Sequence, residues 1–247
     1  TKDSVVELCM DLIKQHIKID RDDLFIEPSA GNGSFIKSIQ SLTNNYKFYD
    51  LEPEHNEIEK QDYLQYKHID DNKTHVVGNP PFGRQSSLAI KFIKKSCEFC
   101  HTLSFILPKS FKKDSLKKTF PLHFHLICEV DLPEKSFLVD EVEHDVPCVF
   151  QIWVKKDTER AVSEKLEPCH FQFVSKTDNP DISFRRVGVN AGTIDQTIDE
   201  KSIQSHYFIK FTNDKSVSDN LKQLSKIKYD FNNTVGPKSI SKQELIF

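Results

Sequence analysis

Short apolar segments alternate with helical segments over the first 155 residues of this 247-residue chain. Apolar runs typical of strands occupy residues 24–27, 47–49, 74–77 and 103–107. Helical spacing of apolar residues predicts helices that start near Val5, Ser34 and Ser87, the last two ending near Leu42 and Phe99. Strands that alternate with helices predict a doubly wound, mostly parallel α/β sheet with right-handed crossovers.

The next part of the chain departs from this alternation. Residues 126–132 and 147–154 are strand-like and no helical pattern separates them, so we expect them to pair antiparallel at one edge. From about residue 157 the chain is more polar, with short strands expected at 170–174 and 207–211 and a capping box at Ser241-x-x-Glu244. The expected organisation is a catalytic domain over residues 1–156 and a small C-terminal extension over residues 157–247.

Composition excludes a membrane-spanning protein. Hydrophobic residues make up 37% of the chain and charged residues 29%, and no apolar run approaches the roughly 20 residues that cross a bilayer. The chain begins at Thr1 without an initiator Met or a leader peptide, and we expect this start to be a domain boundary.

The six cysteines are too sparse for a disulfide framework and favour a reducing, intracellular compartment, either cytoplasm or nucleus. Cys97-x-x-Cys100-His101 lacks the second pair of ligands that a structural zinc site needs. We therefore expect buried thiols and no metal site.

Net charge is −3, which argues against coating of nucleic acid by bulk electrostatics. Basic residues nevertheless concentrate between Arg84 and Lys118, where only Glu98 and Asp114 oppose them. Such a stripe can contact a phosphate backbone. A solvated helix face explains the individual lysines equally well.

Asn79-Pro80-Pro81-Phe82 directly follows the apolar run 74–77. Two prolines exclude a helix and fix the backbone, which holds the Asn side chain, the adjacent carbonyl groups and an aromatic face in one geometry. An amide oxygen and a proline carbonyl can accept both N–H bonds of an exocyclic amine while Phe82 stacks on its ring, most plausibly adenine. The alternative is an ordinary turn at the end of a strand.

A second turn, Glu27-Pro28-Ser29-Ala30-Gly31-Asn32-Gly33, follows the first strand. Small residues let the backbone approach a ligand, yet the spacing is neither that of a dinucleotide loop nor that of a phosphate loop. The Glu27 carboxylate repels pyrophosphate and suits an amine cation. S-Adenosylmethionine carries such a cation and has no phosphate.

Two further acidic positions complete the pattern. Asp50, at the end of the second strand, is placed to bind ribose hydroxyls, with Glu52 as second choice. Asp62 suits the amino group of the cofactor adenine and Tyr63 its ring face. Taken singly, solvated acids and a core tyrosine explain these residues as well.

The succession EPSAGNGSF, YDLEP, QDYL and NPPF resembles the class I S-adenosylmethionine-dependent methyltransferases, specifically the adenine-N6 group with a gamma-like order of motifs. The likeness covers about residues 1–155. It implies a Rossmann-like methyltransferase fold with a seven-stranded sheet, and S-adenosylmethionine as the cofactor. The start at Thr1-Lys2, followed by an amphipathic helix, is similar to the family's cofactor-capping motif.

The resemblance also implies roles for individual residues. Glu27 and the backbone of Ala30 and Gly31 would hold the methionine part, and Asn79 with the Pro80 carbonyl would accept from the target amine. Phe137 lies where family members carry a second aromatic against the base, with a core contact as the alternative, and Lys109 lies in an L-P-x-x-F segment at the pocket wall. The full expected set is catalytic Asn79, Pro80, Pro81 and Phe82; cofactor-binding Thr1, Glu27, Pro28, Ala30, Gly31, Gly33, Asp50, Leu51, Asp62, Tyr63 and Asn79; substrate-binding Phe82, Phe137, Lys109, Arg185 and Arg186.

Three functions remain open from the sequence. The gamma-like order favours a DNA adenine-N6 methyltransferase, and the modest extension favours an RNA adenine-N6 methyltransferase. The third is a catalytically silent scaffold subunit that binds nucleic acid, and methylation of protein Gln is a minor option. Arg185 and Arg186 lie in a glycine-containing segment. They are suited to contact the phosphate backbone of a nucleic acid, and the alternative is a hairpin with two solvated arginines. An extension of about 90 residues is small for reading duplex sequence, so a partner chain or a structured RNA is expected to assist.

Overall fold

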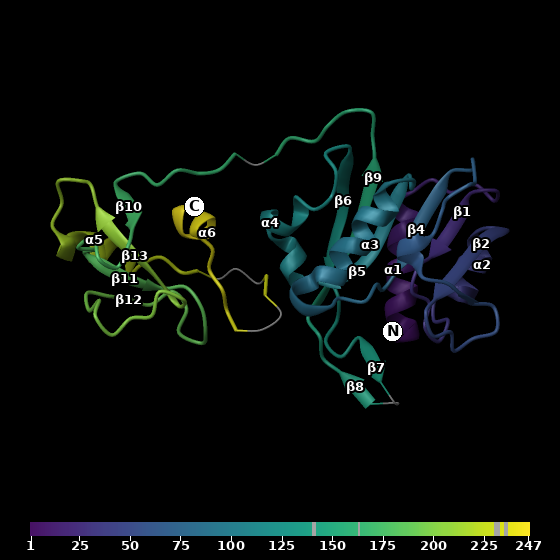
Figure 1. The fold of residues 1–247 in the computed structure, drawn as a ribbon, viewed down its shortest axis with the longest axis horizontal. Helices are drawn as coiled ribbons and strands as arrows, with labels where there is room; N and C mark the ends of the chain where they lie inside the picture. Colours follow the sequence, from purple (N-terminus) through teal and green to yellow (C-terminus); the bar gives the residue numbers. More distant parts are fainter. Residues whose placement is uncertain (140–141, 163, 230–232, 235–236) are drawn as a thin grey trace. The chain divides into compact units, whose positions relative to one another are not determined.

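The computed structural model describes residues 1–139, 142–162, 164–229, 233–234 and 237–247. The chain forms two compact units, Thr1–Val162 and Ser163–Phe247 (Figure 1). Each unit has its own sheet and its own apolar core.

The first unit is built on a seven-stranded sheet in the order β3-β2-β1-β4-β5-β9-β6 (Figure 1). The pairs β3-β2, β2-β1, β1-β4 and β4-β5 are parallel, and β9 is antiparallel to both β5 and β6. The strands are β1 Leu24–Glu27, β2 Asn45–Asp50, β3 Glu59–Lys60, β4 Thr74–Gly78, β5 Thr102–Pro108, β6 Phe124–Asp131 and β9 Cys148–Lys155. The predicted doubly wound, mostly parallel sheet is confirmed.

Helices cover both faces of this sheet, and the buried residues fall into two clusters. Successive residues of a strand point to opposite faces, and so Phe25 packs with helices α1 and α2 whereas Ile26 packs with helix α3. The helices of this unit are α1 Asp3–His16, α2 Ile36–Leu42, α3 Ser87–Cys97 and α4 Asp114–Lys117, with 3-10 turns η1 Tyr63–Gln65, η2 Arg84–Ser86 and η3 Lys109–Lys112.

Three features of this unit were not predicted. The short edge strand β3 lies in a stretch read from the sequence as irregular, and β7 Phe137–Val139 pairs antiparallel with β8 Val142–His144 within a stretch read as a loop. The two late strands do pair antiparallel as expected, but β9 is inserted between β5 and β6. Strand β9 is buried along most of its length because it has a neighbour on each side.

A buried polar cluster lies at the amino ends of the parallel strands. His75 Nε2 is 2.9 Å from Asp23 Oδ2, and His75 Nδ1 is 2.7 Å from Thr102 Oγ1. All three residues are buried. Burial lowers the pKa of His75 below its usual value, and the bond to Asp23 offsets this only in part. In the folded protein His75 is therefore still neutral at pH values at which the same histidine in the unfolded chain begins to bind a proton.

This cluster predicts a pH-dependent stability. Between the lowered pKa of folded His75 and its usual value of 6.5, the unfolded chain binds a proton that the native protein does not. The free energy of unfolding should therefore fall as pH drops from 7.5 to 5.5. In urea denaturation, His75→Gln should flatten this dependence and His16→Gln, at the exposed end of α1, should leave it unchanged. An unchanged slope in His75→Gln would contradict the assignment.

The second unit holds a four-stranded antiparallel sheet in the order β10-β13-β11-β12. Its core joins the sheet to two short helices around Ile182, Phe184 and Ile209. Ser241 and Glu244 form the predicted capping box at the start of the second helix. The elements are β10 Phe171–Val174, β11 Ile182–Arg185, β12 Ile194–Asp195, β13 His206–Phe211, α5 Val217–Leu224 and α6 Lys242–Ile246.

The cysteines are free thiols, buried except for Cys169. Burial raises the pKa of Cys100, which lies beside Cys97. Within the described ranges, no group of three or more His, Cys, Asp or Glu side chains is arranged to hold a metal ion. None of the described helices is long and apolar enough to cross a membrane.

Candidate active site at the carboxyl ends of the strands

Three polar residues selected from the sequence end or follow neighbouring strands. Glu27 ends β1, Asp50 ends β2 and Asn79 follows β4. Strands β2, β1 and β4 are adjacent and parallel, so their carboxyl ends meet at one edge of the sheet (Figure 1). Ligands of open α/β sheets bind at this edge.

Glu27 is a buried carboxylate of the first unit, only 2% exposed. Its Oε2 has no hydrogen-bond partner among the residues that the structure describes. Burial, reinforced by the nearby charge of Asp50, holds the pKa of Glu27 well above its usual range. The amino group of Thr1 favours the charged form of Glu27 but offsets burial only in part, so this position is suited to receive a further cation.

The side chain of Glu27 packs directly against Gly78, which has no side chain of its own. Its φ is +147°, and a Cβ there would lie 3.1 Å from Glu27 Cγ. A side chain at position 78 would therefore crowd Glu27, and its positive φ would in addition be strained for any residue other than glycine.

Asp50 fixes the glycine turn. The backbone N–H of Gly31 donates to Asp50 Oδ2 at 2.7 Å, and Gly31 and Gly33 have positive φ of +53° and +84°. The turn is also tied to the sheet because Ala30 N–H donates to the carbonyl of Tyr49 at 2.9 Å. Each carboxylate oxygen can accept more than one hydrogen bond, so Asp50 keeps acceptor capacity for a ligand.

A backbone hydrogen bond between Gln61 and Asp50 holds Asp62 near the end of β2. The N–H of Gln61 donates to the carbonyl of Asp50 at 2.9 Å, and Asp62 itself is exposed and accepts from Leu64 N–H at 3.0 Å. Leu51, next to Asp50, is an exposed apolar side chain. Both are accessible to a ligand at the end of β2.

Tyr63 does not fit its predicted role as a ring face for the cofactor. The 3-10 turn η1 directs it into the core under α3, where it is 1% exposed. Its hydroxyl is 2.8 Å from Ser96 Oγ, and its ring stacks on Phe92 with centroids 5.4 Å apart. We therefore assign Tyr63 to the core, the alternative that its sequence context allowed.

The turn after β4 is bonded to the glycine turn. Ser29 Oγ donates to the carbonyl of Asn79 at 3.1 Å, and Asn79 Nδ2 is 3.5 Å from Thr1 Oγ1. Asn79 Oδ1 is buried and lacks a hydrogen-bond partner within the described part of the chain. An amide oxygen left in this state is an acceptor available to a ligand N–H.

Phe82 is half-buried and contacts both core clusters of the first unit. Its carbonyl accepts from the N–H groups of Leu88 at 3.1 Å and Ala89 at 3.3 Å, which anchors the start of α3. The three residues Gly83, Gln85 and Ser86 that follow have φ of +68°, +53° and +61°. Left-handed non-glycine residues concentrate at functional sites, where the surrounding structure holds them in place.

The remaining expected site residues have other contacts. Phe137 is 9% exposed and belongs to the buried cluster against which Phe82 packs. Lys109 Nζ is 3.2 Å from Asp131 Oδ2. Pro28 and Pro80 are buried, and Pro81 is exposed.

The two arginines of the second unit are bonded within that unit. Arg185 Nε donates to the carbonyl of Val187 at 3.2 Å, and Arg186 donates to the carbonyl of Gln204 and lies over the ring of Tyr207. Both guanidinium groups still have further N–H donors.

The basic stripe is partly neutralised. Lys112 bonds to Asp131 at 3.0 Å, and Lys117 bonds to Glu129 at 3.0 Å. The exposed cations of the stripe are Arg84, Lys91, Lys94 and Lys118.

Sequence reasoning missed Ser29 and Gly78. Ser29 lies inside the glycine turn, and its hydroxyl, next to the small residues of that turn, was the available signal. Gly78 directly precedes Asn79, and its signal was a glycine at the end of a strand that is rich in β-branched residues.

Comparison with protein families identifies the chain. The family model of the EDM2 methyltransferase-like domain matches residues 36–165, which is more than half of the chain. The chain belongs to the EDM2 methyltransferase-like domain family. The predicted class I S-adenosylmethionine-dependent methyltransferase is thereby confirmed at this level. No sequence among curated proteins is significantly similar to this EDM2-like chain.

A solved structure from Listeria monocytogenes supports the fold of this EDM2-like domain. A Listeria monocytogenes protein described as a class I S-adenosylmethionine-dependent methyltransferase aligns with a TM-score of 0.50 at 15% identity, over 67% of this chain and 64% of that one. An RNA methyltransferase structure from Pyrococcus horikoshii has a TM-score of 0.45 at 14% identity, over 62% and 81%. A Plasmodium falciparum dimethyladenosine transferase has a TM-score of 0.43 at 16% identity, over 60% and 61%. At such identities the likeness concerns the fold.

Proposed function

We propose that this protein transfers a methyl group from S-adenosylmethionine to the N6 amino group of adenine in nucleic acid, with DNA as the first substrate to test. The observation that carries the proposal is the buried, unpartnered Asn79 Oδ1, in a proline-fixed turn beside Phe82. A ligand that presents an N–H to this oxygen would satisfy it.

The residues around the glycine turn fit the cofactor. Glu27 Oε2 lacks a hydrogen-bond partner among the described residues, and the Thr1 amino group offsets the burial of its carboxylate only in part, which suits the ammonium of the methionine part. Asp50 would bind the ribose, Asp62 the adenine amino group and Leu51 a ring face, with the backbone of Ala30, Gly31 and Gly33 close to the ligand. When bound, S-adenosylmethionine supplies an electrophilic methyl group.

The turn at Asn79 would activate the target nitrogen. An adenine amino group is a weak nucleophile because its lone pair is delocalised into the ring. Acceptance of both N–H bonds by Asn79 Oδ1 and the Pro80 carbonyl favours a pyramidal nitrogen and stabilises the positive charge that develops on it. Phe82 would stack on the base, which must leave a duplex or come from a single strand to reach this turn.

One experiment separates the candidate functions. Methyl transfer from radiolabelled S-adenosylmethionine should be measured in parallel on duplex DNA, single-stranded DNA, total RNA and protein, followed by nucleoside analysis. N6-Methyladenosine or its deoxy form is the expected product. Label on protein alone would overturn the proposal, and absence of cofactor binding in calorimetry would favour a silent scaffold.

A further inference from the structure

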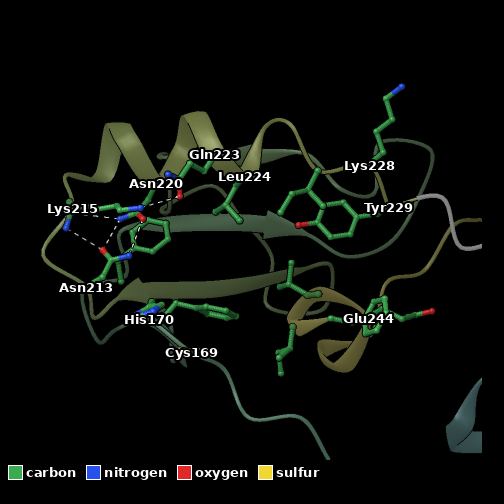
Figure 2. Close-up of a pocket in the computed structure, with 16 residues that line it drawn as sticks. Cys169, His170, Asn213, Lys215, Asn220, Gln223, Leu224, Lys228, Tyr229 and Glu244 are labelled. Carbon is green, nitrogen blue, oxygen red and sulfur yellow. Dashed lines mark hydrogen bonds between the residues drawn. The ribbon is translucent and has the colours of Figure 1, made fainter.

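The second unit contains a cavity of about 620 Å³ between helix α5, strands β10 and β13, and the C-terminal helix α6 (Figure 2). All of its lining residues come from this unit. Its size is in the range of pockets that hold small organic ligands. None of the proposed methyl-transfer residues contributes to it.

The wall of the cavity is apolar and partly aromatic. Phe171, Phe211 and Tyr229 supply rings, and Leu224 and Leu245 supply aliphatic side chains. Tyr229 is 6% exposed, and its hydroxyl oxygen has no hydrogen-bond partner among the described residues. A planar ligand with a polar ring edge would fit such a wall and satisfy this hydroxyl.

The polar side chains at one end of the cavity are held rigidly. Asn213 and Asn220 bond each other reciprocally, with both amide contacts at 3.0 Å (Figure 2). Lys215 N–H donates to Asn213 Oδ1 at 3.2 Å, which fixes the loop before α5. His170 lies next to this end, since its carbonyl accepts from Thr212 N–H at 2.9 Å, and it has a φ of +68°, a conformation that is uncommon outside glycine.

The charged groups that line the cavity are predominantly basic. Lys215 and Lys228 are exposed and lie on opposite sides of the cavity in Figure 2. Glu244, the only side-chain carboxylate that lines the cavity in the described part of the chain, already accepts from Ser241 N–H at 2.7 Å and from Asn233 Nδ2 at 2.6 Å. Aromatic walls with an exposed cation on either side complement a planar, anionic ligand.

We propose that this cavity binds one unstacked nucleotide of a single-stranded segment of the target, its base against Phe211 and Tyr229 and its phosphates near Lys215 and Lys228. The inference rests on the proposed function, since it takes nucleic acid as the substrate. Aromatic stacking together with lysine contacts to phosphate is the usual mode of single-strand binding. The methylated adenine and this nucleotide would occupy separate sites.

The test is direct binding of the full chain to fluorescent ten-nucleotide single strands of RNA and DNA, followed by anisotropy at several salt concentrations. Phe211→Leu should weaken binding about tenfold or more, the usual worth of one stacked base. Tyr229→Phe should weaken it about threefold to tenfold, the usual worth of a hydrogen bond, without lowering the melting temperature.

A charge-matched pair of variants isolates the lysines. Lys215→Gln with Lys228→Gln should flatten the dependence of log affinity on log salt by about 0.7 per lost phosphate contact. Lys222→Gln with Lys226→Gln removes the same charge from exposed positions outside the cavity and should leave the salt dependence nearly unchanged.

The outcomes distinguish this inference from the proposed function. Binding that survives Asn79→Ala but falls in the cavity variants supports the inference. Equal binding by wild type and all cavity variants overturns it and leaves methyl transfer to adenine intact. Failure to bind either strand, together with methylation of protein, overturns both.

Discussion

Replacing Asn79 by alanine is expected to lower methyl transfer by about 100- to 1,000-fold, the usual effect of losing one preorganised group that stabilises transition-state charge. Affinity for S-adenosylmethionine should stay nearly unchanged, because Asn79 Oδ1 is assigned to the target amine. Single-turnover kinetics with saturating cofactor would measure the first effect and calorimetry the second.

The matched control for this experiment lies just beyond the other end of β4. Asn72 is exposed and precedes β4 at its opposite end, so Asn72→Ala removes the same side chain far from the proposed chemistry. It should retain full turnover. If Asn79→Ala also retains full turnover, Asn79 is not the acceptor for the target amine.

Glu27→Gln is expected to act in opposite directions on binding and stability. Loss of a charge-assisted hydrogen bond should weaken cofactor binding by about 10- to 100-fold, which corresponds to about 1.5–3 kcal/mol. Removal of a buried carboxyl group whose Oε2 has no hydrogen-bond partner in the described part of the chain should raise the stability of the free protein by roughly 1–3 kcal/mol. Calorimetric titration and urea unfolding at pH 7.5 would measure the two effects.

The same residue predicts proton-linked binding. Burial raises the pKa of Glu27 in the free protein, and an ammonium ligand would favour its charged form. Binding should therefore release protons, and affinity should rise with pH until it passes the pKa of the free protein. Titrations in buffers of different ionisation enthalpy detect this release. The control Glu52→Gln changes an exposed carboxylate of the next turn and should preserve the proton release. An unchanged proton release in Glu27→Gln would remove Glu27 from the proposed site.

The parallel half of the fold was predictable because each strand carries its own local signal. Leu24–Glu27 and Thr74–Gly78 are short apolar runs that end in polar residues or glycine, and a parallel sheet brings those ends together. The position of β9 was not predictable, since strand order depends on pairing between segments distant in the chain. The same limit hid the β7-β8 hairpin, because register and pairing are tertiary properties.

The residues of the candidate site were likewise predictable only in part. Glu27, Asp50 and Asn79 were found because their positions relative to strand ends follow from the sequence pattern. Tyr63 was placed wrongly at the ligand because the rotation of a 3-10 turn decides whether a side chain points to the core or to the crevice. The cavity of the second unit had no sequence signal, since its walls come from β10, β13, α5 and α6.

Strand β9 lies between β5 and β6, so the sheet of the first unit is incomplete until this segment has been synthesised. A chain that ends before Cys148 leaves β5 with an unpaired edge and β6 without a neighbour, and such edges promote aggregation. Arg160 lies just beyond this strand, and its guanidinium donates to the carbonyls of Lys117, Phe120, Pro121 and Phe124. Strand β9 is the last of the seven strands in chain order, so this sheet is completed only after residues 148–155 have been synthesised, and shortened versions need to retain Arg160.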